Sequence, residues 1–281
     1  MSIIEYSERL ASHPRDVKHY DTEALRQEFL IENLFEDDKV KLVYTGYDRM
    51  IAGGVVPKSD AIKLEPIDPM KAAYFCERRE LGIINLGGKA LITADETTYE
   101  LCCKEALYLT QGTKEIIFES ASTDQPALLY LNSAPAHRAF KNKLIRRSDV
   151  NVIPLGEEKY ANKRNINQFI VAKTCETCQL QMGFTELQPG SVWNTMPPHT
   201  HTRRMEVYLY TDLEEGQAVC HFMGEGNETR HIWMHNNQAV ISPNWSIHSA
   251  AGTSNYTFIW GMAGENLDFS DMDVIKPTEI K

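Results

Sequence analysis

Short apolar segments separated by turn-forming residues run through most of this chain of 281 residues. Val40–Tyr44, Met50–Val56 and Leu81–Thr93 are examples, and the same texture resumes at Gln168 and continues to Met262. The segments are rich in β-branched and aromatic residues and are broken by Gly, Pro and Asp, which is typical of short strands joined by tight turns. Strands at this density favour a sandwich or barrel. We therefore predict an all-β fold.

The N-terminal stretch has a different pattern. Leu25, Phe29 and Leu30 recur at helical spacing, and Asp21 or Thr22 is available as the helix N-cap. We expect residues 1–35 to form an N-terminal helical arm. Between residues 135 and 161 the apolar pattern breaks again, which predicts a linker. This divides the remainder into domains at 36–155 and 156–281, and the polar stretch from 265 to 281 is expected to close the second domain or an interface.

Charge and cysteine content narrow the possible partners. The net charge of −10 argues against nucleic acid or an anionic membrane as the main partner. The sequence has no apolar run of about 18 residues, as a membrane span requires, and no apolar signal-peptide core. The six cysteines are expected to be reduced thiols, including the Cys175-x-x-Cys178 pair. We therefore expect a cytoplasmic protein with a small-molecule substrate.

Four residues form a candidate metal site. His199 and His201 are two positions apart, so on an extended strand both imidazoles point to the same face. Glu206 follows closely, and His248 arrives from a separate segment. Three imidazoles and one carboxylate on one face are suitable ligands for a divalent transition metal.

The two halves of the chain resemble one another. Arg78–Leu81 matches Arg203–Val207, and Thr110–Glu115 lies at a similar offset to Pro243–His248. This predicts a duplicated β unit. The first copy lacks the histidine pair and has Glu115 in place of the last histidine, so we expect it to be free of metal. Its Arg78-Arg79-Glu80 segment is interpreted as a salt-bridged strand end or an interface feature.

The pattern H-x-H-x4-E at His199, His201 and Glu206, with P-x4-H ending at His248, resembles the cupin signature. The resemblance implies a bicupin with two β-barrel (jelly-roll) domains. Two departures from the signature leave the ligands intact: Gly190 is further from His199 than usual, and Trp245 stands where Gly is frequent.

Longer strings resemble one family more closely. They include F-C-E-R-R-E-L-G-I-I-N-L-G-G, N-T-M-P-P-H-T-H-T-R-R-M-E-V-Y and E-T-R-H-I-W-M-H-N-N-Q-A-V-I-S-P-N-W-S-I-H-S. They are similar to the 5-keto-4-deoxyuronate isomerases, also called 4-deoxy-L-threo-5-hexosulose-uronate ketol-isomerases, of bacterial pectin breakdown. The resemblance covers nearly the whole chain and implies an intramolecular oxidoreductase, namely a ketol-isomerase that interconverts an aldose and a ketose.

By this resemblance the enzyme would be a homo-hexamer with one Zn²⁺ per chain. It would convert 5-dehydro-4-deoxy-D-glucuronate to 3-deoxy-D-glycero-2,5-hexodiulosonate. The family's metal ligands map onto His199, His201, Glu206 and His248.

The residues fit such a reaction. A divalent metal held by these four residues would supply Lewis acidity to two adjacent substrate oxygens and so could favour an enediolate. Glu206, Tyr208 or a metal-bound hydroxide remain open as the group that moves the proton. Tyr208 shares strand parity with Glu206 and is expected to face the same interior. The substrate carboxylate needs a cation, and Arg203 or Arg204 is the nearest in sequence, of which strand parity admits at most one.

Two further features have alternative interpretations. Trp245 and Trp260 are candidates for a substrate-binding wall, with core packing as the alternative. Lys163-Arg164 is expected to lie in a solvated turn.

Two other functional classes stay open at this stage. The same ligand set holds redox-active metals in cupin dioxygenases, and the sequence alone does not select the metal. A sugar-acid-binding or regulatory bicupin without catalysis is the third class. A need for dissolved oxygen would distinguish the second class, and tight binding without interconversion the third.

Overall fold

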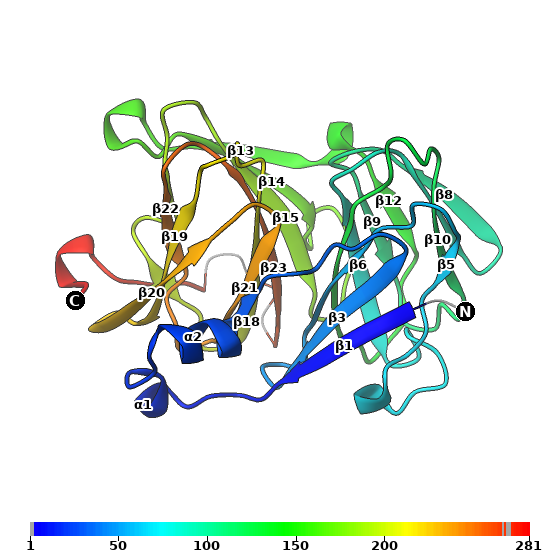
Figure 1. Cartoon of the computed structure of the whole chain (residues 1–281), viewed down its shortest axis with the longest axis horizontal. Coiled ribbons are helices and arrows are strands. Elements are labelled where there is room, and N and C mark those ends of the chain that lie inside the picture. The colour runs from blue at the N-terminus through cyan, green and yellow to red at the C-terminus, as the bar shows by residue number, and fades with distance from the viewer. Residues whose placement is uncertain (1–2, 266, 268–270) are drawn as a thin grey trace. The chain divides into compact units, whose positions relative to one another are not determined.

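The computed structural model describes residues 3–265, 267 and 271–281, which form two compact units (Figure 1). Each unit contains one seven-stranded and one four-stranded sheet, so the predicted all-β fold is confirmed. The first unit comprises the segment ending at Arg9, Asn33–Val150 and Phe169–Met182; the second comprises Leu10–Glu32, Asn151–Gln168 and Gly183–Lys281.

The larger sheet of the first unit is ordered β1-β3-β4-β11-β6-β9-β12, and the smaller is ordered β5-β10-β7-β8. The strands of the larger sheet are β1 (Ile3–Arg9), β3 (Lys39–Thr45), β4 (Ile51–Val55), β11 (Leu129–Pro135), β6 (Arg79–Asn85), β9 (Ala106–Leu109) and β12 (Lys143–Ile145). The smaller sheet contains β5 (Ile62–Lys63), β10 (Ile116–Ser120), β7 (Ala90–Ala94) and β8 (Thr97–Leu101). Two 3₁₀ turns, η1 (Asp68–Met70) and η2 (Arg147–Asp149), complete the unit.

The second unit repeats this arrangement, with sheets ordered β13-β14-β15-β23-β18-β21-β2 and β16-β22-β19-β20. The larger sheet contains β13 (Asn151–Leu155), β14 (Arg164–Ile170), β15 (Gln181–Leu187), β23 (Thr257–Gly264), β18 (Arg204–Thr211), β21 (Gln238–Ser242) and β2 (Leu30–Ile31). The smaller contains β16 (Trp193–Asn194), β22 (Ser249–Gly252), β19 (Val219–Glu225) and β20 (Glu228–Met234). The order β4-β11-β6-β9 of the first unit corresponds to β15-β23-β18-β21 here, as a duplicated unit predicts.

Apolar side chains fill the space between the sheets of the first unit. Leu81 and Ile83 on β6, Ile92 on β7 and Phe118 on β10 belong to one buried cluster. Because these residues come from both sheets, the two sheets pack face to face around a hydrophobic core.

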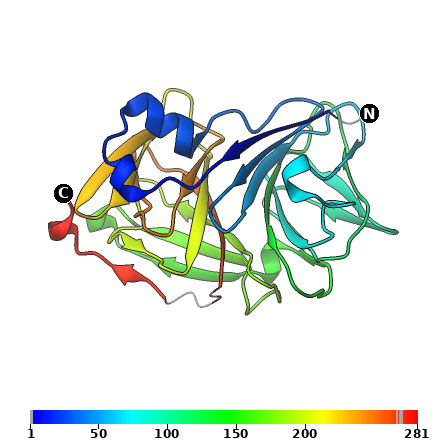
Figure 2. The same ribbon diagram turned by 90° about the horizontal axis from the view of Figure 1, so that it is seen from below.

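The N-terminal segment is only partly helical. Helix α2 (Thr22–Phe29) begins at Asp21, whose carboxylate accepts a hydrogen bond from the Ala24 amide at 2.8 Å. This helix and the short α1 (Pro14–Val17) lie against β19, β20 and β21 of the second unit (Figure 2). Residues 3–9, in contrast to the expected helical arm, form strand β1, parallel to β3. Most of the side chains of β1 are exposed, so its sequence has no buried face that would reveal a strand.

Near the C-terminus, strand β24 (Asp273–Val274) pairs with β17 (His199–Thr200), and η4 (Pro277–Glu279) follows. The remaining 3₁₀ turn of the second unit is η3 (Glu158–Tyr160). Of the stretch expected to close the domain or an interface, residues 266 and 268–270 lie outside the described residues. None of the helices in the described part is long and apolar enough to span a membrane.

Glu80 is a fully buried carboxylate within the first unit. It accepts hydrogen bonds from the backbone amides of Cys178, Gln179 and Leu180 at 2.7–2.8 Å. The hydroxyl of Tyr108 donates a fourth at 2.8 Å. Glu80 therefore anchors the 178–180 segment to β6 through hydrogen bonds, where the sequence had predicted a salt-bridged strand end.

Replacing Glu80 by Ala is expected to lower the free energy of unfolding by about 3–5 kcal/mol, because three buried amides and a hydroxyl lose their acceptor. Urea denaturation measures this change. Glu100→Ala is the control, since Glu100 forms only an exposed ion pair with Lys89, and its effect is expected within about 0.5 kcal/mol. Equal stability of the two variants would contradict the anchoring role.

Candidate metal centre

Strand β18 supplies one side of the site. Arg204, Glu206 and Tyr208 alternate along this strand and all line the same cavity. The strand is held on both sides: Glu206 is paired with Ser242 on β21 and with Met262 on β23. Because both neighbours restrict the register, the Glu206 carboxylate is directed into the interior of the second unit.

The histidines come from two other segments. His199 lies on β17, where it pairs with Val274 of β24. His248 follows a turn closed by a hydrogen bond from the Ser246 amide to the carbonyl of Pro243 at 2.9 Å. The Ser246 hydroxyl also accepts a hydrogen bond from the amide of Gly224 at 2.9 Å, which attaches this turn to β19.

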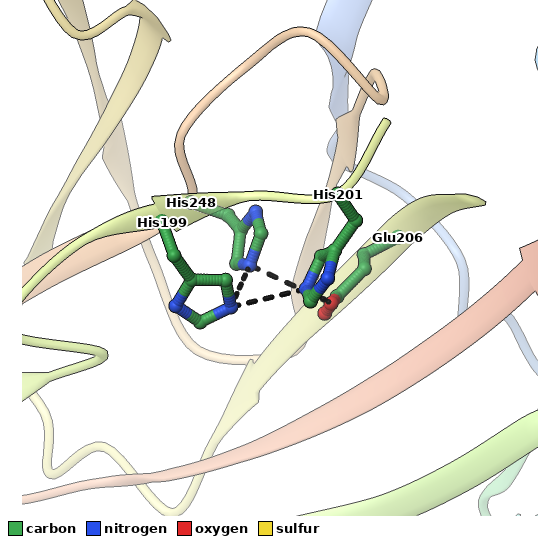
Figure 3. A group of neighbouring side chains, drawn as sticks. All are labelled: His199, His201, Glu206 and His248. Atoms are coloured by element: carbon green, nitrogen blue, oxygen red, sulfur yellow. Dashed lines mark hydrogen bonds and ion pairs between the residues drawn. The ribbon is translucent and has the colours of Figure 1, made fainter. Parts of the chain in front are cut away.

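The four side chains converge (Figure 3). Their donor atoms all lie within 4.8 Å of one another. The Nε2 atom of His199 is 3.0 Å from Nε2 of His201 and 3.0 Å from Nε2 of His248. The Glu206 Oε1 atom is 2.7 Å from His201 Nε2 and 3.5 Å from His248 Nε2.

These separations fit a shared metal ion. With metal–ligand distances of about 2.0–2.1 Å, two donors of a tetrahedral site lie roughly 3.3 Å apart. The four contacts of 2.7–3.5 Å surround this value. Three nitrogens and one oxygen are compatible with zinc and with several redox-active metals, so the donor set does not select one of them.

A second layer of contacts orients the ligands. The His201 Nδ1 atom lies 3.4 Å from the Asp271 carboxylate and 3.3 Å from Nη2 of Arg204. The His248 Nδ1 atom is 3.4 Å from the hydroxyl of Ser242. Polar partners at the second ring nitrogen are the usual way in which a metal-binding imidazole is held in one tautomer.

Burial and mutual charge determine the protonation of the cluster. Burial lowers the pKa of His199 to about 4, and it holds the pKa of His248 well below its ordinary value. Burial alone would raise the pKa of Glu206, but the neighbouring histidines lower it far below its usual range. At neutral pH, His199 and His248 are therefore neutral and Glu206 is ionised, which are the forms that bind a metal.

The cluster opens into a cavity of about 460 Å³ in the second unit. This volume is in the range of cavities that bind small molecules. Its walls are mainly apolar, with Ile166 from β14 and Phe258 and Trp260 from β23. Gly183 on β15 lies behind Trp260: a Cβ atom at this position would be 2.3 Å from the indole ring.

The structure separates the predicted substrate-binding residues into two groups. Arg204 and Trp260 line the cavity. Arg203 points away, with 62% of its side chain exposed, and pairs with Glu265. Trp245 also lies outside the cavity lining, with its ring 6.5 Å from that of Phe29 in an edge-on contact. Arg203 lies in the turn before β18, whereas Arg204 is the first residue of that strand and shares the inward face of Glu206.

Two residues near the cluster were missed by the sequence analysis. Arg164 lines the cavity instead of lying in a solvated turn, because strand β14 begins at this residue and directs it inward together with Ile166. Asp271 pairs with Arg204 at 2.6 Å, across a long sequence separation that no local pattern signals. Strand parity with Ile166 was the available signal for Arg164.

The fold and the donor set define a protein of the cupin type, with a possible metal-binding group in its second unit. Residues 29–276 match the model of the KduI/IolB family, and the chain belongs to this family.

Curated relatives are similar over nearly the whole length. The 4-deoxy-L-threo-5-hexosulose-uronate ketol-isomerase of Formosa agariphila is 60% identical over 277 residues, covering 99% of both chains. The protein of the same name from Bacteroides fragilis is 53% identical, covering 98% of this chain and 99% of the relative. The one from Yersinia enterocolitica is 50% identical, covering 96% and 98%.

Solved structures with low sequence identity share the fold. An IolB-like protein from Salmonella typhimurium has a TM-score of 0.69 at 14% identity, covering 88% of this chain and 96% of that chain. Oxalate decarboxylase from Lactobacillus farciminis has a TM-score of 0.56 at 13% identity, covering 80% and 79%.

Replacing His248 by Ala is expected to reduce bound metal to less than about a tenth of the wild-type content and to abolish activity, because one of four ligands is lost. The β fold is expected to survive. Elemental analysis and circular dichroism measure both properties. His235→Ala, at an exposed histidine, is the control and should retain its metal. Wild-type metal content in His248→Ala would refute the ligand assignment.

Proposed function

We propose that this protein is a metal-dependent ketol-isomerase that converts 5-dehydro-4-deoxy-D-glucuronate to 3-deoxy-D-glycero-2,5-hexodiulosonate in the degradation of pectin and related polyuronates. The support is an identity of 50–60% with ketol-isomerases over nearly the whole chain. The convergence of His199, His201, Glu206 and His248 beside a cavity of suitable size is the observation that links this identity to chemistry.

Zinc is the metal that we propose, with one ion per chain held by the three histidines and Glu206. It would supply Lewis acidity without redox chemistry, favouring the negative charge that develops on the substrate oxygens. Glu206 is better suited to be a ligand than a general base, because a carboxylate with so low a pKa holds a proton poorly.

We assign the proton-donating role to Tyr208. Its hydroxyl lies 3.3 Å from that of Thr195, which also lines the cavity. Burial raises the pKa of Tyr208 well above its ordinary value, and the charge of Glu206 acts in the same direction. Tyr208 therefore keeps its proton at neutral pH and can donate it, or a hydrogen bond, to a substrate oxygen.

We further propose a homo-hexamer in the cytoplasm. The family resemblance supports the assembly. All six cysteines are free, as is usual in a reducing compartment. A small sugar acid is the proposed partner, with no role for nucleic acid or a membrane.

A cupin dioxygenase with a redox-active metal is the less favoured alternative. The same donor set would serve it, but the relatives at 50–60% identity carry the name of an isomerase.

Removing the metal with a chelator is expected to abolish turnover of 5-dehydro-4-deoxy-D-glucuronate, and adding zinc should restore it, because the charge on the substrate oxygens then lacks its counter-charge. Isomerisation, metal content and oxygen uptake are measured on the same sample. Isomerase inactivity of the fully loaded protein would refute the proposal, and oxygen-dependent turnover would favour the dioxygenase.

Replacing Tyr208 by Phe is expected to lower kcat by about 100-fold, the lower range for loss of a general acid, while metal content stays unchanged. Tyr210→Phe is a matched control on the same strand, because Tyr210 bonds to His221 outside the cavity lining. If Tyr208→Phe keeps the wild-type kcat, another group donates the proton.

A further inference from the structure

We infer that Arg164 binds the carboxylate of the substrate and sets the preference of the cavity for an acid over a neutral sugar. This inference rests on the proposed function, which requires recognition of an open-chain uronate.

The two arginines nearest to the ligands in sequence are already paired with carboxylates. Arg203 is largely exposed and pairs with Glu265 outside the cavity. Arg204 lines the cavity but is only 2% exposed, and its Nη2 atom is 2.6 Å from Asp271. Because Asp271 offsets its charge, Arg204 is better suited to support His201 than to attract a further anion.

Arg164 is in a different situation. Its Nη1 atom donates a hydrogen bond to the carbonyl of Asn162 at 2.8 Å, which fixes the guanidinium at the cavity wall. Among the residues that the structure describes, no carboxylate forms an ion pair with it. Burial lowers its pKa, which reflects the unfavourable transfer of an uncompensated charge out of water. An anionic ligand would offset the free-energy cost of that transfer, and the planar guanidinium is suited to bind a carboxylate.

The metal-ligand cluster and Arg164 correspond to the two polar ends of the substrate. In the sheet, β14 is separated from β18 by β15 and β23, so Arg164 and Glu206 reach the cavity from strands that are not neighbours. Both side chains extend into the cavity, and the apolar Phe258 and Trp260 of β23 line the wall between these strands. A 4-deoxyuronate has its reacting oxygens at one end, a methylene group in the middle and the carboxylate at the other end.

This arrangement gives the substrate one orientation. The carbonyl and hydroxyl of the reacting carbons face the metal ligands, while the carboxylate faces Arg164. The methylene group then lies against the apolar wall, where a hydroxyl would lose its hydrogen bonds to water.

The test compares Arg164→Met with Lys163→Met in the metal-loaded protein. Lys163 is the adjacent cation, but it is exposed and pairs with Glu158 outside the cavity lining. For Arg164→Met we expect KM to rise by about 100-fold with a much smaller change in kcat, because the lost contact is remote from the reacting carbons. Lys163→Met should keep both wild-type constants.

A second readout separates recognition from structure. The wild type should prefer the acid over its neutral methyl ester, and Arg164→Met should lose this preference. Arg164→Lys keeps the charge without the planar fork and should recover part of it. Arg164→Lys replaces Arg164→Met as the test variant if circular dichroism and metal content show that Arg164→Met does not fold. In that case the preference of Arg164→Lys for the acid over the ester tests the inference, and a preference equal to that of the wild type would contradict it.

An unchanged KM and an unchanged acid preference in folded Arg164 variants, with an active wild type, would overturn this inference alone. Inactivity of the loaded wild type would instead refute the proposed function. In that case the inference is tested by calorimetry with the borohydride-reduced substrate, a 3-deoxyhexonate that cannot isomerise. Equal binding to the wild type and Arg164→Met would then overturn it.

Discussion

The register of β18 between β21 and β23 is the constraint on which the site depends. It places Arg204, Glu206 and Tyr208 inside the second unit, and a shift by one residue would replace them with Met205 and Val207. The three residues have different tasks along one strand face. Arg204 contacts His201 and Asp271, Glu206 completes the donor set, and Tyr208 lies further along the cavity.

The two units share one strand order, but one encloses a hydrophobic core and the other a cavity with a candidate metal site. In the first unit, Leu81, Ile83 and their neighbours occupy the interior, and the fully buried carboxylate of Glu80 is satisfied by backbone amides and the Tyr108 hydroxyl. In the second unit the corresponding strand, β18, carries polar residues on its inner face, and a cavity remains. The difference between the units lies in which side chains face inward and not in the topology.

The sequence predicted the all-β fold, the duplication and the four residues that the structure brings together, because strand alternation and local spacing express them directly. It did not predict β1, whose side chains are mostly exposed and which forms through backbone pairing with β3. Arg164 was missed because it starts its strand beside an exposed lysine, so its inward direction depends on where β14 begins. The contact of Asp271 with Arg204 depends on tertiary structure, which local spacing does not encode.

Gly183 has a consequence for the width of the cavity. It is absent from the cavity lining, yet the ring of Trp260 occupies the space that its side chain would need. Any larger residue at position 183 would clash with the indole and with the Asn167 carbonyl, and so would displace a wall of the cavity. The width of the cavity therefore depends in part on a position outside its lining, and chains with identical linings but another residue at this position would have differently shaped cavities.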